Sequence, residues 1–116
     1  MWVTVTGQVS LNNAVGIFQE TFDAAIKLGT NLILIDCTAM TNVLSELERY
    51  HLGSISADYA LQRSKESIAL KVAVVGTPPV IDRFAELVAS NRGVTTETFS
   101  NTTDAVGWLH RFAEGS

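Results

Sequence analysis

The segment Asn31–Asp36 constrains the fold more than any other stretch of this chain. It places four aliphatic residues in a row, Leu32 to Ile35, and closes them with an acid. Such a run is typical of a strand buried on both faces, with its polar end at the carboxyl edge of a parallel sheet. Residues 70–75 have the same aliphatic character and predict a second interior strand.

Two further segments predict outer strands. Residues 2–6 alternate, with Val3 and Val5 on one side and Trp2, Thr4 and Thr6 on the other, and residues 94–99 are rich in threonine. Strands with one less apolar face belong near the edges of a sheet. Apolar residues at helical spacing follow each strand. They predict helices from Ser10–Asn13 to Gly29, from Ser45 to near Ser64, from Thr77 to Asn91, and from Ser100 or Asn101 to about Phe112.

This alternation predicts one α/β domain over residues 1–116, with four strand-helix units and a mainly parallel sheet. Because the second and third strands are the most apolar, we expect the sequential order 1-2-3-4. Right-handed crossovers in that order carry the helices to one face. Something else must then cover the other face of the central strand, and a partner subunit is one candidate.

The bulk composition excludes several classes of function. The chain has 116 residues and a formal net charge of -4, and its eight Lys and Arg residues are scattered singly. A nucleic-acid surface or a polybasic membrane patch is therefore not predicted. No apolar run approaches the roughly 20 residues that span a bilayer, and no signal peptide is indicated, so we expect a cytoplasmic protein without membrane insertion.

The loop after the central strand carries the residues most suited to function. Asp36, Thr38, Asn42, Ser45 and Glu46 are expected near the carboxyl ends of the central strands, where parallel sheets place ligand crevices. Two interpretations stay open: turn and capping chemistry, which the capping-box spacing of Ser45 and Glu48 favours, or an interaction surface.

A weaker anion-site candidate is Thr77, which opens a helix after Val75 and Gly76. The segment lacks the glycine pattern and the lysine of a P-loop, and Pro78 removes one backbone donor.

No pattern predicts catalytic, metal-binding or cofactor-binding residues. Cys37 follows a buried strand and is interpreted as a small apolar residue rather than a nucleophile. A phosphatase-type or rhodanese-type loop would need an arginine six positions later, where the chain has Val43. His51 and His110 are far apart in sequence, and no Cys or carboxylate stands at metal-ligand spacing to either.

The order of these segments resembles the STAS superfamily, the sulfate-transporter and anti-sigma-factor-antagonist domains. The resemblance rests on hydrophobic patterns over nearly the whole chain, among them Leu32–Asp36, Val72–Gly76 and Thr103–Leu109. It is greatest to the divergent SpoIIAA-like branch, where an Ala-x-x-Trp-Leu ending is familiar. It implies a strand-helix superhelix and a regulatory binding module without a catalytic centre.

In phosphorylated members of that superfamily, a kinase modifies a serine at the start of the second helix, a position that Ser45 matches. The preceding acid and the following glycine of that motif are missing here, and Glu46 and Glu48 would repel a phosphate. Members also begin with an extra strand that pairs with the one starting here at Trp2. Without that strand the edge is open, which favours self-association into a homodimer.

We therefore expect a non-enzymatic regulatory or protein-interaction module whose partner is unknown. The alternative is a carrier of a small apolar ligand in a pocket between helices and sheet, lined by Phe18, Phe22, Tyr59, Phe84 and Trp108. An enzyme, for instance a nucleotide hydrolase, is disfavoured because the sequence lacks a phosphate cradle, a paired acid site and an activated nucleophile.

Overall fold

A computed structural model describes residues 1–42, 44–63, 70–76 and 94–115. The described elements are β1 (Trp2–Gly7), α1 (Leu11–Leu28), β2 (Leu32–Met40), α2 (Glu46–Arg63), β3 (Leu70–Val75), β4 (Val94–Phe99) and α4 (Thr102–Gly115). The helix predicted from Thr77 to Asn91 lies outside the described residues.

The four strands form one sheet in the order β1-β2-β3-β4, and every neighbouring pair is parallel. This confirms the predicted sequential order. The two central strands hold the most deeply buried aliphatic residues of the sheet, among them Ile33, Ile35 and Val75, none of which has any solvent exposure. An aliphatic run on both sides of a strand is stable only where both faces are covered, which places β2 and β3 inside.

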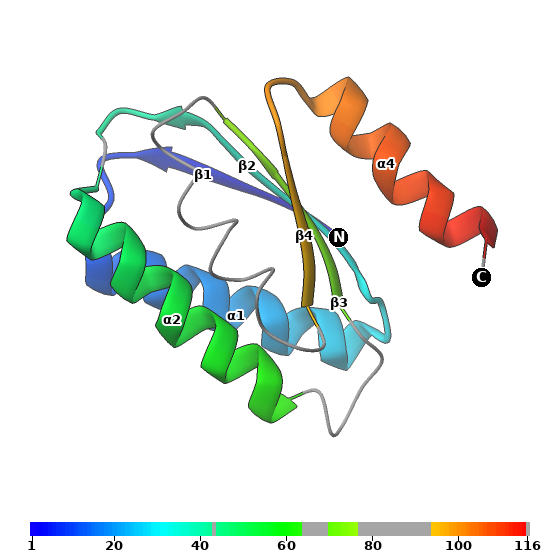
Figure 1. The fold of residues 1–116 in the computed structure, drawn as a ribbon, viewed down its shortest axis with the longest axis horizontal. Helices are drawn as coiled ribbons and strands as arrows, with labels where there is room; N and C mark the ends of the chain where they lie inside the picture. The colour runs from blue at the N-terminus through cyan, green and yellow to red at the C-terminus, as the bar shows by residue number, and fades with distance from the viewer. Residues whose placement is uncertain (43, 64–69, 77–93, 116) are drawn as a thin grey trace.

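The helices do not all lie on one face. Helices α1 and α2 cover one face of the sheet, and α4 lies on the opposite face (Figure 1). The expectation that the helices share a face is wrong for α4, which itself covers part of the face for which a partner subunit was one candidate. Leu34, Ala73 and Val75 point away from α1, and the fully buried Ala105 and the buried Leu109 of α4 pack against them.

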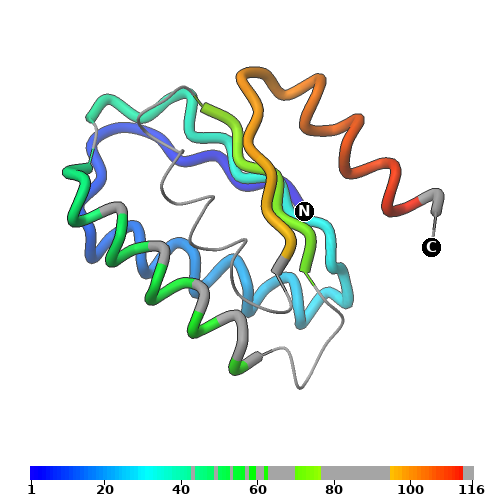
Figure 2. The backbone as a smooth tube through the Cα atoms, viewed as in Figure 1, coloured from blue at the N-terminus to red at the C-terminus, as the bar shows by residue number. Residues whose placement is uncertain are grey.

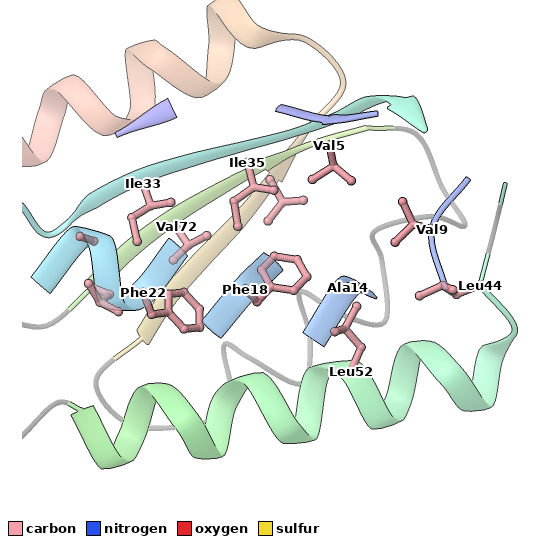
Figure 3. Packing of buried hydrophobic residues seen from close by; sticks show 13 residues of the cluster. Val5, Val9, Ala14, Phe18, Phe22, Ile33, Ile35, Leu44, Leu52 and Val72 are labelled. Atoms are coloured by element: carbon pink, nitrogen blue, oxygen red, sulfur yellow. The ribbon is translucent and has the colours of Figure 1, made fainter. Parts of the chain in front are cut away.

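The larger core lies between the sheet and helices α1 and α2 (Figure 3). Phe22 of α1 is 1% exposed and packs with Ile33 and Ile35 of β2 in this cluster. Full burial of one such side chain stabilises the fold by about 1.5–3 kcal/mol. Tyr59 of α2 donates a hydrogen bond to Asp23 Oδ1 of α1 at 2.5 Å, which joins the two helices beside this core.

Aromatic residues extend the smaller core along α4. The rings of Phe99 and Trp108 are 5.7 Å apart, and those of Trp108 and Phe112 are 4.9 Å apart. Lys71 of β3 places its Nζ 5.3 Å from the centre of the Phe112 ring. This cation-π contact places the lysine charge against an aromatic ring, whose electrons attract it.

The predicted ends of α1 are confirmed. Ser10 is the N-cap and accepts a hydrogen bond from the Asn13 backbone, and Gly29 ends the helix with a left-handed φ of 75°. A glycine adopts this backbone conformation without the steric cost that a Cβ would add. Helix α2 continues without interruption through Gly53, so the helix does not break there.

Strand β2 is longer than predicted. The sequence predicts a strand that ends at Asp36, whereas β2 continues to Met40 and contains one extra residue relative to β1. The pairing moves from Thr4 with Asp36 to Thr6 with Ala39, which defines a β-bulge. Thr38, inside the bulge, donates to Asp36 Oδ1 from its backbone nitrogen at 2.9 Å and from its hydroxyl at 2.6 Å. The strand therefore continues through polar residues because Asp36 satisfies the donors of the bulge.

Candidate functional site

The carboxyl ends of β1 and β2 meet the starts of α1 and α2 at one end of the molecule, where the two connecting loops lie side by side (Figure 2). The Thr41 backbone donates to the Gly7 carbonyl at 2.9 Å, which extends the pairing of the two strands into these loops. A parallel sheet brings the carboxyl ends of neighbouring strands to one edge, so this location follows from the topology.

Asn42 joins the two loops. Its Oδ1 accepts a hydrogen bond from the Val9 backbone nitrogen at 2.7 Å, and its Nδ2 donates to the Val9 carbonyl at 2.8 Å. The side-chain amide thus pairs with both polar groups of one backbone residue, as a neighbouring strand would. Because Val9 is buried, both of these backbone groups need such partners.

The start of α2 is a complete capping box, as its spacing predicts. Glu48 donates from its backbone nitrogen to Ser45 Oγ at 3.1 Å, and Ser45 donates from its backbone nitrogen to Glu48 Oε1 at 3.0 Å. Both Glu46 and Glu48 lie in the first turn, where the positive end of the helix dipole favours carboxylates.

A shallow polar cleft of about 380 Å³ lies between these two loops. Hydroxyl, amide and carboxylate groups line most of it, with two aliphatic side chains at its base. The lining residues are Gln8, Val9, Ser10, Asn13, Asn42, Leu44 and Glu48. We name this surface the loop cleft. Its groups can donate and accept hydrogen bonds, which suits recognition of a polar surface or main chain.

The structure brings some of the predicted site residues together and separates others. Asn42 lines the loop cleft, and Ser45 and Glu46 lie directly beside it at the start of α2. Asp36 and Thr38 are hydrogen-bonded to each other at the bulge of β2 and do not line the cleft. Thr77 lies outside the described residues.

Sequence reasoning missed the contribution of the first loop. Gln8, Ser10 and Asn13 line the loop cleft, although Ser10 and Asn13 were interpreted as helix-start residues and Gln8 was given no role. The predicted strand order contains the missing signal, because adjacent parallel strands place their following loops next to each other. Side chains from both loops could therefore have been grouped before the structure was known.

Cys37 lies on the face of the sheet that α1 and α2 cover and packs against the larger core. Burial raises the pKa of its thiol to about 11, and the nearby Asp36 charge contributes in the same direction. The thiol is therefore protonated at neutral pH, which agrees with its interpretation as a small apolar residue.

The two histidines are exposed on separate helices. His51 of α2 meets the ring of Tyr50 edge-on at 6.1 Å, and His110 of α4 borders an apolar groove. Over residues 1–42, 44–63, 70–76 and 94–115, no three His, Cys, Asp or Glu side chains form a group that could hold a metal ion. None of the helices described there combines the length and apolar character needed to cross a bilayer.

The expected lining of an apolar ligand pocket is not brought together. Phe18 and Phe22 are buried in the larger core with ring centres 6.5 Å apart, whereas Trp108 packs on the opposite face of the sheet. Phe84 lies outside the described residues. The grouping of Trp108 with the two phenylalanines is therefore wrong, because α4 crosses to the other face.

An apolar groove does exist, in a different place. A depression of about 230 Å³ lies between α4 and the sheet and is lined mainly by aliphatic and aromatic side chains. They are Met1, Trp2, Leu32, Leu34, Val106, Leu109, His110 and Ala113. Trp2 is 55% exposed there, which is unusual for the largest apolar side chain.

Comparison with protein-family models and with curated proteins finds no match to this chain.

Proposed function

We propose that this protein is a non-enzymatic regulatory or protein-interaction module with the STAS type of architecture, and that it binds a protein partner through the loop cleft. Two observations support the architecture: the strand order 1-2-3-4, and the strictly parallel pairing. The observation that carries the binding proposal is the pair of hydrogen bonds between Asn42 and Val9.

These hydrogen bonds matter because they fix two loops relative to each other. Loops usually lose conformational entropy when they bind, and this loss weakens the complex. Here the Asn42 side chain, the capping box of Ser45 and the cap at Ser10 hold the polar groups of the cleft in place before binding. A surface that is ordered in advance keeps more of its contact energy as affinity.

Ser45 fits a capping role better than a phosphorylation role. Its hydroxyl accepts the Glu48 backbone hydrogen bond, and the Glu48 carboxylate lies against the Ser45 backbone. A phosphate on Ser45 would bring two negative groups together and break the reciprocal pair. We therefore propose that binding at the cleft does not need a phosphate switch.

The test is site-specific photocrosslinking in cells. A photoreactive amino acid at Gln8, inside the loop cleft, is expected to attach a discrete partner, whereas the same group at the exposed Asp58 of α2 is not. Glu46→Arg, beside the cleft, should abolish the crosslink from Gln8. The matched charge reversal Asp58→Arg should leave it intact. No discrete crosslink from Gln8, or an equal crosslink from Asp58, would remove the cleft from consideration.

The groove under α4 favours a second candidate function, the carriage of a small apolar ligand. Its lining is mostly apolar, and the exposed Trp2 borders it. The variant Trp108→Phe leaves Trp2 as the single tryptophan, so its fluorescence reports on the groove. Titration with a medium-chain fatty acid should shift this fluorescence saturably, and Leu109→Lys should prevent the shift. An unchanged spectrum would remove the carrier function.

A further inference from the structure

Strand β1 has an outer edge that no described strand pairs with. The hydrogen bonds at its beginning show which backbone groups point that way. The Met1 nitrogen donates to the Leu32 carbonyl at 2.8 Å, and the Met1 carbonyl accepts from the Leu34 nitrogen at 2.8 Å. Because this orientation alternates along a strand, Val3 and Val5 also direct their backbone groups toward β2. Trp2, Thr4 and Thr6 direct theirs outward.

This edge lacks the features with which proteins usually prevent strand pairing. Lysine, proline and bulges on an edge strand discourage the addition of another strand. Residues Trp2–Gly7 contain no charged residue and no proline, and the extra residue of the bulge lies in β2 rather than in β1. Strand β4, by contrast, carries the exposed Glu97. Within the part of the chain that the structure describes, the backbone of β1 is thus open to an extended chain.

A groove beside this edge could receive the side chains of such a chain. It has a volume of about 460 Å³ and runs between β1 and α1. It is lined by Met1, Val3, Thr4, Val5, Thr6, Ile17, Glu20, Thr21 and Ala24. Glu20 is the one charged side chain in this set, and it is exposed. On the opposite face of the sheet, Trp2 is 55% exposed beside the same edge.

We propose that β1 binds an extended segment of another protein as an additional strand. The outward backbone groups of Trp2, Thr4 and Thr6 would pair with its main chain. Alternate side chains of the segment would enter the groove, where they should be small and aliphatic, with one lysine or arginine beside Glu20. The remaining side chains would lie on the Trp2 face and should be apolar. This surface is separate from the loop cleft, so either proposal can fail without affecting the other.

A second copy of this chain fits the edge less well than a foreign segment. The antiparallel register that pairs all the outward groups is centred on Thr4, with Trp2 opposite Thr6 of the other copy. It would place the Glu20 side chains of both copies on the same side of the sheet, next to the symmetry axis. Like charges facing each other across strands are unfavourable, and each chain has a net charge of -4. A basic partner segment avoids this repulsion.

Selection from a displayed library of random short peptides on the full chain tests the chemistry of the partner. Enriched peptides should alternate between apolar residues that face Trp2 and small aliphatic residues that face the groove, with a lysine or arginine at one groove-facing position. Selection on Glu20→Lys should replace the basic residue by aspartate or glutamate. Enrichment without alternation, or identical peptides from both proteins, would overturn the proposal.

Two variants of Thr4 test the backbone pairing with one synthetic peptide from that selection. Thr4→Pro removes an outward N–H group without touching the bonds between β1 and β2, and should weaken binding roughly tenfold or more. Thr4→Val keeps the N–H group and should change affinity by no more than about twofold. Equal binding by Thr4→Pro, measured by calorimetry, would exclude strand addition.

Hydrogen exchange on the unmodified chain keeps the test valid if Thr4→Pro fails to fold. The amides of Trp2, Thr4 and Thr6 should exchange rapidly in the free protein and become protected with the peptide, while those of Val3 and Val5 stay protected throughout. No added protection would overturn the proposal. Light scattering could instead show a concentration-dependent dimer, with the same three amides protected in the absence of peptide. That result would show that a second copy is the occupant, and it would also overturn the proposal.

Discussion

The amide side chain of Asn42 does for Val9 what a neighbouring strand does elsewhere in the sheet. The two residues are 33 positions apart, yet both polar groups of Val9 find their partners on one side chain. An aspartate could accept the Val9 hydrogen bond but could not donate the second, and a leucine could do neither. The position therefore requires an amide.

We expect Asn42→Ala to lower the free energy of unfolding by about 1–3 kcal/mol, because two buried backbone groups lose their partners. Urea denaturation measures this loss. The control is Asn12→Ala, which changes an exposed asparagine in the first turn of α1 and should alter stability by less than about 0.5 kcal/mol. Equal effects of the two variants would mean that water replaces the Asn42 amide at no cost.

The partly buried thiol of Cys37 should make stability fall at alkaline pH. Its pKa is raised to about 11 in the folded state, against an ordinary value of 9.0. The stabilising effect is complete below pH 9 and is lost as pH rises toward 11, because the unfolded thiol releases its proton first. The loss is on the order of 3 kcal/mol at most.

This pH dependence can be isolated with Cys37→Val, which removes the ionisable group and keeps an apolar side chain. Denaturation between pH 8 and pH 11 should show a smaller decline for the variant than for the native protein. Alkylation of the folded native protein by iodoacetamide should also be slow at pH 8 and fast in denaturant. A folded thiol that reacts at its unfolded rate would contradict the burial of Cys37.

At the scale of single residues, the sequence identified Asn42 and Ser45 but not all of their roles. The capping box was predictable because Ser45 and Glu48 are three positions apart, and their bonds are local. The partner of Asn42 was not, because it depends on how the loop after β2 lies against the loop after β1. Spacing along the chain carries little information on such a distant contact.

At the scale of elements, the start of α2 makes a direct prediction. Ser45→Ala removes the acceptor of the Glu48 backbone hydrogen bond and should cost about 1 kcal/mol in thermal or urea denaturation. Ser45→Asn, which keeps a capping oxygen, should recover most of that loss. If Ser45→Asn is as unstable as Ser45→Ala, the capping box contributes nothing to the stability of α2.

The elements also show why β2 and α4 departed from expectation. The polar residues Asp36 and Thr38 resemble the beginning of a loop, but they bond to each other inside a bulge and the strand continues to Met40. The apolar spacing of α4 predicted a helix with a buried stripe, and this was confirmed. Helical periodicity says nothing about which face of the sheet receives that stripe.

At the scale of the whole molecule, one sheet separates two cores. The strand order was predictable because the aliphatic runs of β2 and β3 must lie between the more polar β1 and β4. The sequence predicted that both faces of the sheet are covered, because Leu34 and its neighbours are apolar. It did not predict that α4 covers the second face. Side chains of the two cores lie on opposite faces of the sheet.

This separation predicts additive effects. Phe22→Leu in the larger core should cost about 1–2 kcal/mol and Leu109→Ala in the smaller core about 2–3 kcal/mol, because each removes buried carbon atoms. The double variant should lose the sum of the two within about 0.5 kcal/mol. Urea denaturation of all four proteins measures the coupling. A coupling above about 1 kcal/mol would show that the sheet transmits strain from one layer to the other.

The position of α4 on its own face has a consequence for synthesis on the ribosome. All four strands precede α4 in the chain, so the sheet can assemble while Leu34, Ala73 and Val75 still face water. A nascent chain at that stage exposes an apolar face of the sheet. Chaperones bind such surfaces, which also aggregate readily. Stalling the ribosome when Phe99 has left the exit tunnel but α4 has not should therefore increase chaperone occupancy on the emerging polypeptide, and stalling after α4 has emerged should not.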